Sequence, residues 1–86
     1  MVDTHMYTVY ILKSKKFKKS YVGYTNDLQR RLDQHNSGQS EFTSKYGPWD
    51  LIYSEEYNLQ TDALLREKYF KTKQGRKFLK KLFESK

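Results

Sequence analysis

The chain has 86 residues and no cysteine, and its formal net charge of +7 comes from 17 Lys and Arg against 10 Asp and Glu. This length allows one small domain with one core, and the lack of cysteine excludes a disulfide framework and a cysteine-based zinc site. No apolar run approaches the roughly 20 residues that span a bilayer, so we expect a cytoplasmic protein without membrane association. Residues 1–5 lack the apolar core of a signal peptide, and Met6 offers a second start, so we expect 1–5 to be an extension or a cloning remnant.

Two strands are predicted first. YTVYIL, residues 7–12, is rich in β-branched and aromatic residues, and SYVGYT, residues 20–25, is a second strand. The short lysine-rich segment between them favours an antiparallel hairpin, which sets Tyr10 and Tyr21 in neighbouring strands. Gly23 gives up packing inside its strand, which indicates a bulge or the close approach of another group, such as a ligand.

A helix is predicted next. Thr25 or Asn26 can cap it, Asp27 lies in its first turn, and Gly38 can end it. Residues 39–48 are richer in Gly, Ser, Thr and Pro than the segment before them and show no hydrophobic periodicity, which predicts a loop.

The rest of the chain adds a strand and two helices. WDLIYSEEY, residues 49–57, is typical of a third strand. Thr61 can cap a second helix, and Gly75 interrupts the pattern before a basic amphipathic third helix. The order strand, strand, helix, strand, helix, helix predicts a small α/β fold in which helices cover a three-stranded sheet.

Basic residues gather in two segments. Residues 13–19 hold five lysines and no acid, and residues 66–86 hold nine basic residues against two acidic ones. Such patches attract phosphate backbones, although lysine-rich faces also serve solubility alone. Together with 16% aromatic residues, they favour nucleic acid, DNA or RNA, as a partner. The candidate contacts are Lys13, Lys15, Lys16, Lys18, Lys19, Arg30, Lys71, Arg76, Lys77 and Lys80.

Glu67 lies inside the apolar arc of its predicted helix, at about 100° per residue. A carboxylate there must be paired, protonated or bound to a cation, because burying an unpaired charge is costly. One interpretation is a salt bridge to Arg66, Lys71 or Arg31. The other is a magnesium site, since Mg²⁺ often takes one or two carboxylates together with water and phosphate oxygens.

Arg31 and His35 share a helix face through their i, i+4 spacing. The planar guanidinium of Arg31 suits a phosphate, and the alternative is a surface ion pair with Asp27. His35 could be an acid, a base or a satisfied helix-end residue. Tyr10 and Tyr21 are equally ambiguous, because tyrosines on strands ordinarily serve packing.

These residues together resemble the GIY-YIG nuclease domain in its short, stand-alone bacterial form. The likeness rests on TVY (residues 8–10), YVG (residues 21–23), Arg31, His35 and Glu67, in that order. HNSG, GPWDLIY and ALLREK add to it, so that it covers residues 6–82, which we take as the domain. The resemblance implies a three-stranded antiparallel sheet flanked by helices, with both tyrosines, the arginine and the glutamate on one face.

The resemblance also implies metal-dependent hydrolysis of a DNA phosphodiester, as in homing endonucleases, some restriction enzymes and the incision subunit of nucleotide excision repair. Carried over by position, Glu67 would hold one Mg²⁺ or Mn²⁺, and Arg31 would stabilise charge on the phosphate. Tyr10 or Tyr21 would position or deprotonate the attacking water. Because an unperturbed tyrosine has a pKa of about 10, Arg31 and the metal would have to favour its phenolate, and His35 is the rival for proton transfer.

Two positions depart from the family pattern. Thr8 stands where the family name has glycine, and Tyr24 follows YVG, where some relatives have a lysine beside the water-activating tyrosine. Longer relatives take target specificity from extra domains, so we expect here a monomer whose cutting is structure-selective or directed by a protein partner. The alternatives are a nucleic-acid-binding module of the same fold that does not cut, and a protein-interaction domain for an acidic partner.

Overall fold

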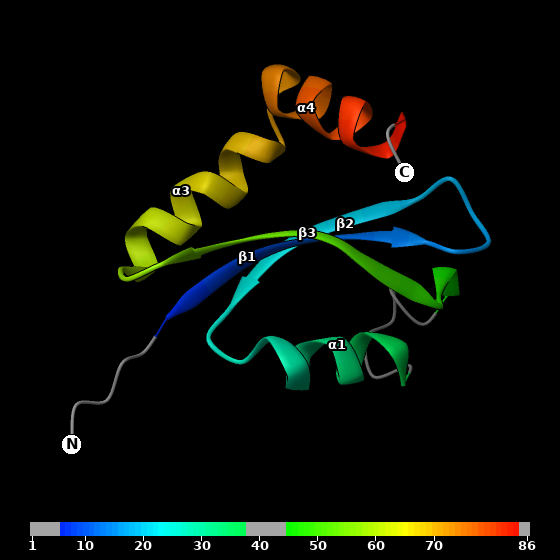
Figure 1. Ribbon diagram of the computed structural model, residues 1–86, viewed down its shortest axis with the longest axis horizontal. Coiled ribbons are helices and arrows are strands. Elements are labelled where there is room, and N and C mark those ends of the chain that lie inside the picture. The colour runs from blue at the N-terminus through cyan, green and yellow to red at the C-terminus, as the bar shows by residue number, and fades with distance from the viewer. Residues whose placement is uncertain (1–5, 38–44, 85–86) are drawn as a thin grey trace.

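The computed structural model describes residues 6–37 and 45–84 (Figure 1). Its elements are the strands β1 (Tyr7–Ser14), β2 (Ser20–Thr25) and β3 (Trp49–Tyr57) and the helices α1 (Leu28–Asn36), α3 (Gln60–Phe70) and α4 (Lys73–Glu84). The predicted order of elements is confirmed. Residues 1–5, Gly38 and residues 39–44 of the predicted loop lie outside the described residues, so the predictions made for them stay predictions.

The three strands form one antiparallel sheet in the order β2-β1-β3, so β1 is the central strand. Tyr10 pairs with Gly23 of β2, and Leu12 pairs with Tyr21. The register toward β3 shifts between Ile11 and Leu12. The predicted hairpin is therefore confirmed, and it brings both predicted site tyrosines to adjacent strands.

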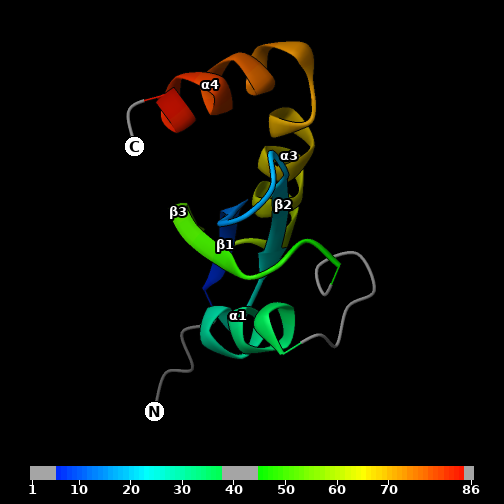
Figure 2. The same cartoon turned by 90° about the vertical axis from the view of Figure 1, so that its right-hand side faces the viewer.

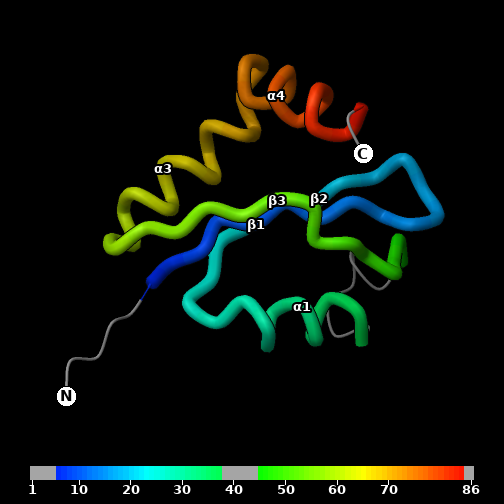
Figure 3. The backbone as a smooth tube through the Cα atoms, viewed as in Figure 1, coloured from blue at the N-terminus to red at the C-terminus, as the bar shows by residue number. Residues whose placement is uncertain are grey.

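Helices cover both faces of the sheet: α1 lies against one face, and α3 and α4 lie against the other (Figures 1 and 2). The tube in Figure 3 shows how the chain passes from β2 to α1 on one side and from β3 to α3 on the other. Because successive side chains of a strand point to opposite faces, β1 supplies both cores. Val9 and Ile11 pack with Phe70 on the α3 side, and Tyr10 and Leu12 pack with Trp49 on the α1 side.

The predicted caps of two helices are wrong in detail. Asp27 itself caps α1, where its Oδ1 accepts a hydrogen bond from the Arg30 amide at 3.2 Å. The reason is local, because Thr25 Oγ1 is already engaged with the Asp27 amide at 3.0 Å. Helix α3 begins at Gln60 after Leu59, which makes no side-chain cap, so the predicted cap Thr61 lies inside the helix.

Gly75 does not precede the third helix as predicted but lies buried in the first turn of α4, which begins at Lys73. A Cβ there would overlap the carbonyl oxygen of Tyr69 and the Cα of Phe70. Glycine thus lets α4 approach the end of α3 closely. Thr72 Oγ1 accepts from the Gly75 amide at 3.2 Å and acts as the cap of α4. Within the described ranges, no helix combines the length and the apolar content needed to cross a bilayer.

Candidate active site

A cavity of about 380 Å³ is bordered by residues of β1, β2, α1 and α3. Four of the five predicted catalytic residues border it: Tyr10, Tyr21, Arg31 and Glu67. Sequence reasoning did not single out Tyr7, Thr25, Asn26 and Gln60 as site residues, yet they also border it, as do Gly23, Tyr24 and Arg30. Four of the side chains that the sequence placed in one site therefore border one cavity, and the fifth, His35, does not.

Gly23 has the close neighbour that its sequence position indicated, and this neighbour is the side chain of Tyr10. A Cβ at residue 23 would lie 2.7 Å from Tyr10 Oη and 2.9 Å from its Cζ, which is too close for a real contact. The ring of Tyr10 therefore passes directly over Gly23, its partner in the sheet. Glycine here makes room for a protein group rather than for a ligand.

His35 does not border the cavity but lies behind Tyr10. Tyr10 Oη and His35 Nε2 are 2.9 Å apart, and the two side chains are 0% and 4% exposed. Tyr21 packs on both, with ring centroids 6.2 Å from Tyr10 and 4.8 Å from His35. The other ring nitrogen of His35, Nδ1, has no hydrogen-bond partner in the described part of the chain. His35 can therefore act on the cavity only through Tyr10 or Tyr21.

Burial sets the protonation of this pair. It raises the pKa of Tyr10 to about 12, with a further rise from Tyr21, while Arg31 acts in the opposite direction. Burial also lowers the pKa of His35, and the nearby charge of Arg31 lowers it further. Both groups are therefore neutral at pH 7. Arg31 does favour the phenolate as expected, but the desolvation of Tyr10 is the larger effect.

Arg31 keeps its guanidinium accessible at the cavity wall. The residue is exposed, and Nη1 donates to Oε1 of Gln34 at 3.2 Å. Among the described residues no ion pair joins Arg31 to Asp27, so the predicted alternative is not found. Arg30 borders the same cavity. The guanidinium of Arg31 retains donors for an anion that enters the cavity.

Glu67 is mostly buried, as its place in the apolar arc predicted. Its side chain is 16% exposed, and Oε1 lies 3.7 Å from Nζ of Lys71, whose side chain is 57% exposed. Of the three predicted salt-bridge partners, Lys71 is thus the one found. The pair is long and half in solvent, so it contributes little to stability.

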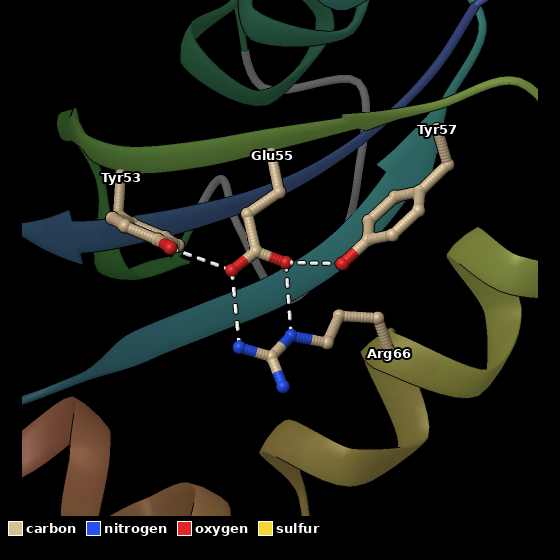
Figure 4. A network of polar contacts seen from close by, with 4 residues as sticks. All are labelled: Tyr53, Glu55, Tyr57 and Arg66. Atoms are coloured by element: carbon tan, nitrogen blue, oxygen red, sulfur yellow. Dashed lines mark hydrogen bonds and ion pairs between the residues drawn. The ribbon is translucent and has the colours of Figure 1, made fainter.

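Glu67 is held in place by its neighbour Arg66, which pairs with Glu55 of β3 (Figure 4). Two guanidinium nitrogens donate to the two carboxylate oxygens at 2.9 and 3.1 Å, and Tyr53 and Tyr57 donate to the same oxygens at 2.5 and 2.6 Å. Burial alone would raise the pKa of Glu55, but these hydrogen bonds lower it below its usual value. This four-residue clamp fixes α3 on the sheet and so sets the direction of Glu67.

Sequence reasoning missed the clamp, although the strand carries a signal for it. Tyr53, Glu55 and Tyr57 alternate along β3, so they share one face. A carboxylate between two aromatic residues on a strand face suggests a buried partner charge. The sequence does not show which basic residue of α3 would meet it.

The donor set of the cavity fits a hard divalent cation. Glu67 is the acidic residue that borders it, and the described ranges hold no group of three or more His, Cys, Asp or Glu side chains that could bind a metal ion. A fully protein-built metal cage is therefore not found there. A single carboxylate suits Mg²⁺, which keeps several waters and takes other ligands from substrate phosphates.

The predicted nucleic-acid contacts fall into three groups. Those that border a second cavity, between β2 and α4, are Lys18, Lys19, Lys71, Arg76 and Lys80. Arg30 borders the first cavity, and Lys15 forms an exposed ion pair with Asp50 at 3.3 Å. Lys15 borders neither cavity, and the same holds for Lys13, Lys16 and Lys77.

Comparison with known proteins agrees with this geometry. The GIY-YIG catalytic domain matches residues 6–81, so the chain belongs to the GIY-YIG family, whose domains are of nuclease type. It is similar to the UPF0213 protein YazA of Bacillus subtilis, with 35% identity over 71 residues that cover 81% of this chain and 71% of that one. A UPF0213 protein of Staphylococcus saprophyticus is 36% identical over 84 residues, which are 96% of this chain and 99% of the relative.

A solved structure shares the fold as well. The solution NMR structure of a UPF0213 protein from Bacillus halodurans superposes with a TM-score of 0.54 at 30% identity and covers 90% of this chain and 84% of that one. The resemblance to short, single-domain bacterial proteins with the GIY-YIG fold is thereby confirmed.

Proposed function

We propose that this protein is a divalent-metal-dependent endonuclease that hydrolyses phosphodiester bonds in DNA. One observation carries the proposal: Tyr10, Tyr21, Arg31 and Glu67 come from four separate elements and border one cavity. Hydrolysis of a phosphodiester needs a positioned water and countercharge on the phosphate. The Glu67 carboxylate, the Arg31 guanidinium and the Tyr21 hydroxyl would meet both needs.

The charged residues would divide the work on the phosphate. The Glu67 carboxylate would bind Mg²⁺ or Mn²⁺, which when bound lowers the pKa of a bound water and offsets charge on the phosphate. Arg31 would donate to a phosphate oxygen through the planar fork of its guanidinium. The weak ion pair between Glu67 and Lys71 supports this role, because a cation can displace Lys71 at small cost.

The two tyrosines differ in what they could do. Tyr10 has no exposed surface, is protonated well above neutral pH and is hydrogen-bonded to His35, so it makes a poor base. Tyr21 is partly exposed and borders the cavity. Tyr21 would therefore hold the attacking water, while Tyr10 and His35 form the buried support behind its ring. Of the three groups considered from sequence, Tyr21 is the one that the accessibility favours.

We also propose that target choice comes from DNA shape or from a protein partner. The described residues form one small sheet with its helices around the cavity, and the exposed basic side chains suit any phosphate backbone. Contacts with phosphates orient a strand but carry no sequence information directly.

A cleavage panel tests the proposal. Duplex, nicked, flapped and branched DNA, together with RNA, are incubated with Mg²⁺ or Mn²⁺ and the wild-type protein, Glu67→Gln or Glu56→Gln. Glu67→Gln should lower the cleavage rate by about 100-fold or more, because it removes the cation ligand. Glu56 is an exposed residue of β3 outside the cavity, so Glu56→Gln should cut like the wild type.

Other outcomes would overturn the proposal in distinct ways. If Glu67→Gln still cuts DNA, Glu67 is not the ligand of the metal ion. If the wild type cuts nothing while its binding to DNA weakens steeply with salt, the protein is a nucleic-acid-binding module that does not cut. Binding that ignores salt, or no binding at all, would favour an acidic protein partner.

A further inference from the structure

A second cavity, of about 650 Å³, lies between strand β2 and helix α4. Figures 1 and 2 show α4 on the same side of the sheet as α3, above the half that leads to the β1–β2 turn. Its apolar lining residues are Val22, Phe70, Leu79 and Phe83, of which Phe70 and Leu79 are buried and Val22 and Phe83 are partly exposed. Tyr21 borders this groove as well as the candidate active site, so the two cavities share one bordering residue on strand β2.

Charge narrows the class of ligand for this groove. Five cations border it and none of its bordering residues is acidic. The cations are Lys18, Lys19, Lys71, Arg76 and Lys80, and all are exposed. Such a concentration of one sign of charge attracts a polyanion and gains from the release of its counterions.

The apolar walls narrow the class further. Binding of phosphates alone needs cations but no hydrophobic surface, whereas this groove also has the partly exposed residues Val22 and Phe83. Unpaired nucleotides offer both a charged backbone and base faces that stack on aromatic or apolar side chains. In a duplex the base faces are stacked on one another and do not reach such a wall. An acidic peptide would match the charge but has no reason to continue past Tyr21 into the active-site cavity.

We propose that this groove binds the unpaired nucleotides of a nucleic-acid strand on one side of the phosphate that enters the candidate active site. The backbone lies along the five cations, and the bases pack against the apolar wall formed with Phe83. Tyr21 marks the border between the groove and the site. The identity of the adjoining phosphate rests on the proposed nuclease function, whereas binding in the groove does not require cutting.

Two adjacent lysines of α4 provide a matched test. Lys80 borders the groove, and Lys81 is exposed on the same helix but does not border it. Fluorescence anisotropy in EDTA measures the affinity of the full chain for a labelled oligodeoxythymidylate and for a duplex of the same length. Lys80→Glu should weaken single-strand binding about tenfold and reduce the slope of log affinity against log salt by about 1. Lys81→Glu makes the same change in net charge and should have a clearly smaller effect.

The apolar wall is tested separately. Phe83→Ala removes the stacking surface and should weaken single-strand binding more than duplex binding, at equal helix content by circular dichroism. If Phe83→Ala is unfolded, the comparison of Lys80→Glu with Lys81→Glu tests the proposal. If Lys80→Glu and Lys81→Glu weaken single-strand binding equally, net charge alone explains the effect, and the proposed binding in the groove is wrong. If a polyglutamate peptide binds as tightly as the oligonucleotide, and Lys80→Glu weakens its binding equally, the groove binds an acidic peptide rather than a nucleic-acid strand.

Failure of the groove and failure of the nuclease function are distinguishable. If the wild type cuts DNA and Lys80→Glu cuts with unchanged KM and kcat, the groove is excluded and the nuclease stands. If single-strand binding is lost selectively in Lys80→Glu but nothing is cut with Mg²⁺ or Mn²⁺, the groove stands and the nuclease fails.

Discussion

Tyr10 Oη of β1 lies 2.9 Å from Nε2 of His35, the buried residue of helix α1. Leu28 and Leu32 pack against the same cluster from α1 but are only partly buried. His35 therefore anchors a short helix to the central strand through a polar contact as well as through packing. Because Arg31 lies one turn before His35, this anchor also determines where the guanidinium meets the cavity.

The first prediction concerns acid stability. Burial and Arg31 lower the pKa of His35 below its usual 6.5, so the unfolded chain binds this proton more readily than the folded one. Stability that is fully present above pH 6.5 should therefore fall as the pH decreases below that value. Urea unfolding followed by circular dichroism at several pH values measures the slope, which should flatten in His35→Gln.

Glu55 provides the control for this titration. Its lowered pKa means that its contribution is lost only as the pH falls below its usual 4.5, so its loss begins at a lower pH than that of His35. Glu55→Gln should leave the slope just below pH 6.5 unchanged. An unaltered slope there in His35→Gln would show that His35 is not the group responsible.

The second prediction concerns Gly23. In Gly23→Ala the new Cβ meets the end of the Tyr10 ring, which is fully buried and held by His35, so something must shift. We expect a loss of about 1–3 kcal/mol in the free energy of unfolding. Combining Gly23→Ala with Tyr10→Leu removes the colliding ring and should make the alanine nearly neutral, as a double-mutant cycle would measure. If Gly23→Ala lowers the free energy of unfolding equally with Tyr10 and with Leu at residue 10, the overlap with the Tyr10 ring is not the cause.

The third prediction concerns the clamp in Figure 4. Glu55→Gln replaces a carboxylate that accepts from Arg66, Tyr53 and Tyr57, and hydrogen bonds to charged groups are each worth more than neutral ones. The free energy of unfolding should fall by about 2 kcal/mol in urea titrations. Asp50→Asn, which breaks the exposed pair with Lys15, should cost less than about 1 kcal/mol. Similar costs for both variants would mean that the clamp is no stronger than a surface ion pair.

The fourth prediction separates the two tyrosines. Tyr21→Phe should lower the rate of DNA cleavage about 100-fold, because the hydroxyl that would hold the water is lost, and it should cost less stability than Tyr10→Phe, because Tyr21 is partly exposed. Tyr10→Phe should instead lower the free energy of unfolding by about 1–3 kcal/mol, because His35 Nε2 loses its partner inside the protein. Single-turnover cleavage and urea unfolding measure the two effects. The reverse pattern is a Tyr10→Phe protein that is stable but no longer cuts DNA. It would assign the role of holding the attacking water to Tyr10.

Several features of the fold followed from short-range sequence patterns alone. The β-branched and aromatic residues of 7–12 predicted a strand, and the helical period placed Glu67 in an apolar arc, where its side chain is 16% exposed. The missing side chain at Gly23 indicated a close neighbour, which is present. Such features depend on residues two to four positions apart, whose relative directions the backbone geometry of strands and helices determines. These patterns did not predict the order of the strands in the sheet.

Tertiary structure alone decided which distant groups meet and what environment they share. Glu55 could have paired with any basic residue of α3, and the packing of the helix on β3 selected Arg66. Caps also escaped prediction where a neighbouring side chain was already engaged, as Thr25 is with the Asp27 amide. The pKa of Tyr10 rises because α1 and Tyr21 remove its hydroxyl from water, and no local pattern contains that burial. The sequence by itself thus determined the candidate chemical groups, and desolvation in the folded chain decided which of them remain accessible for chemistry.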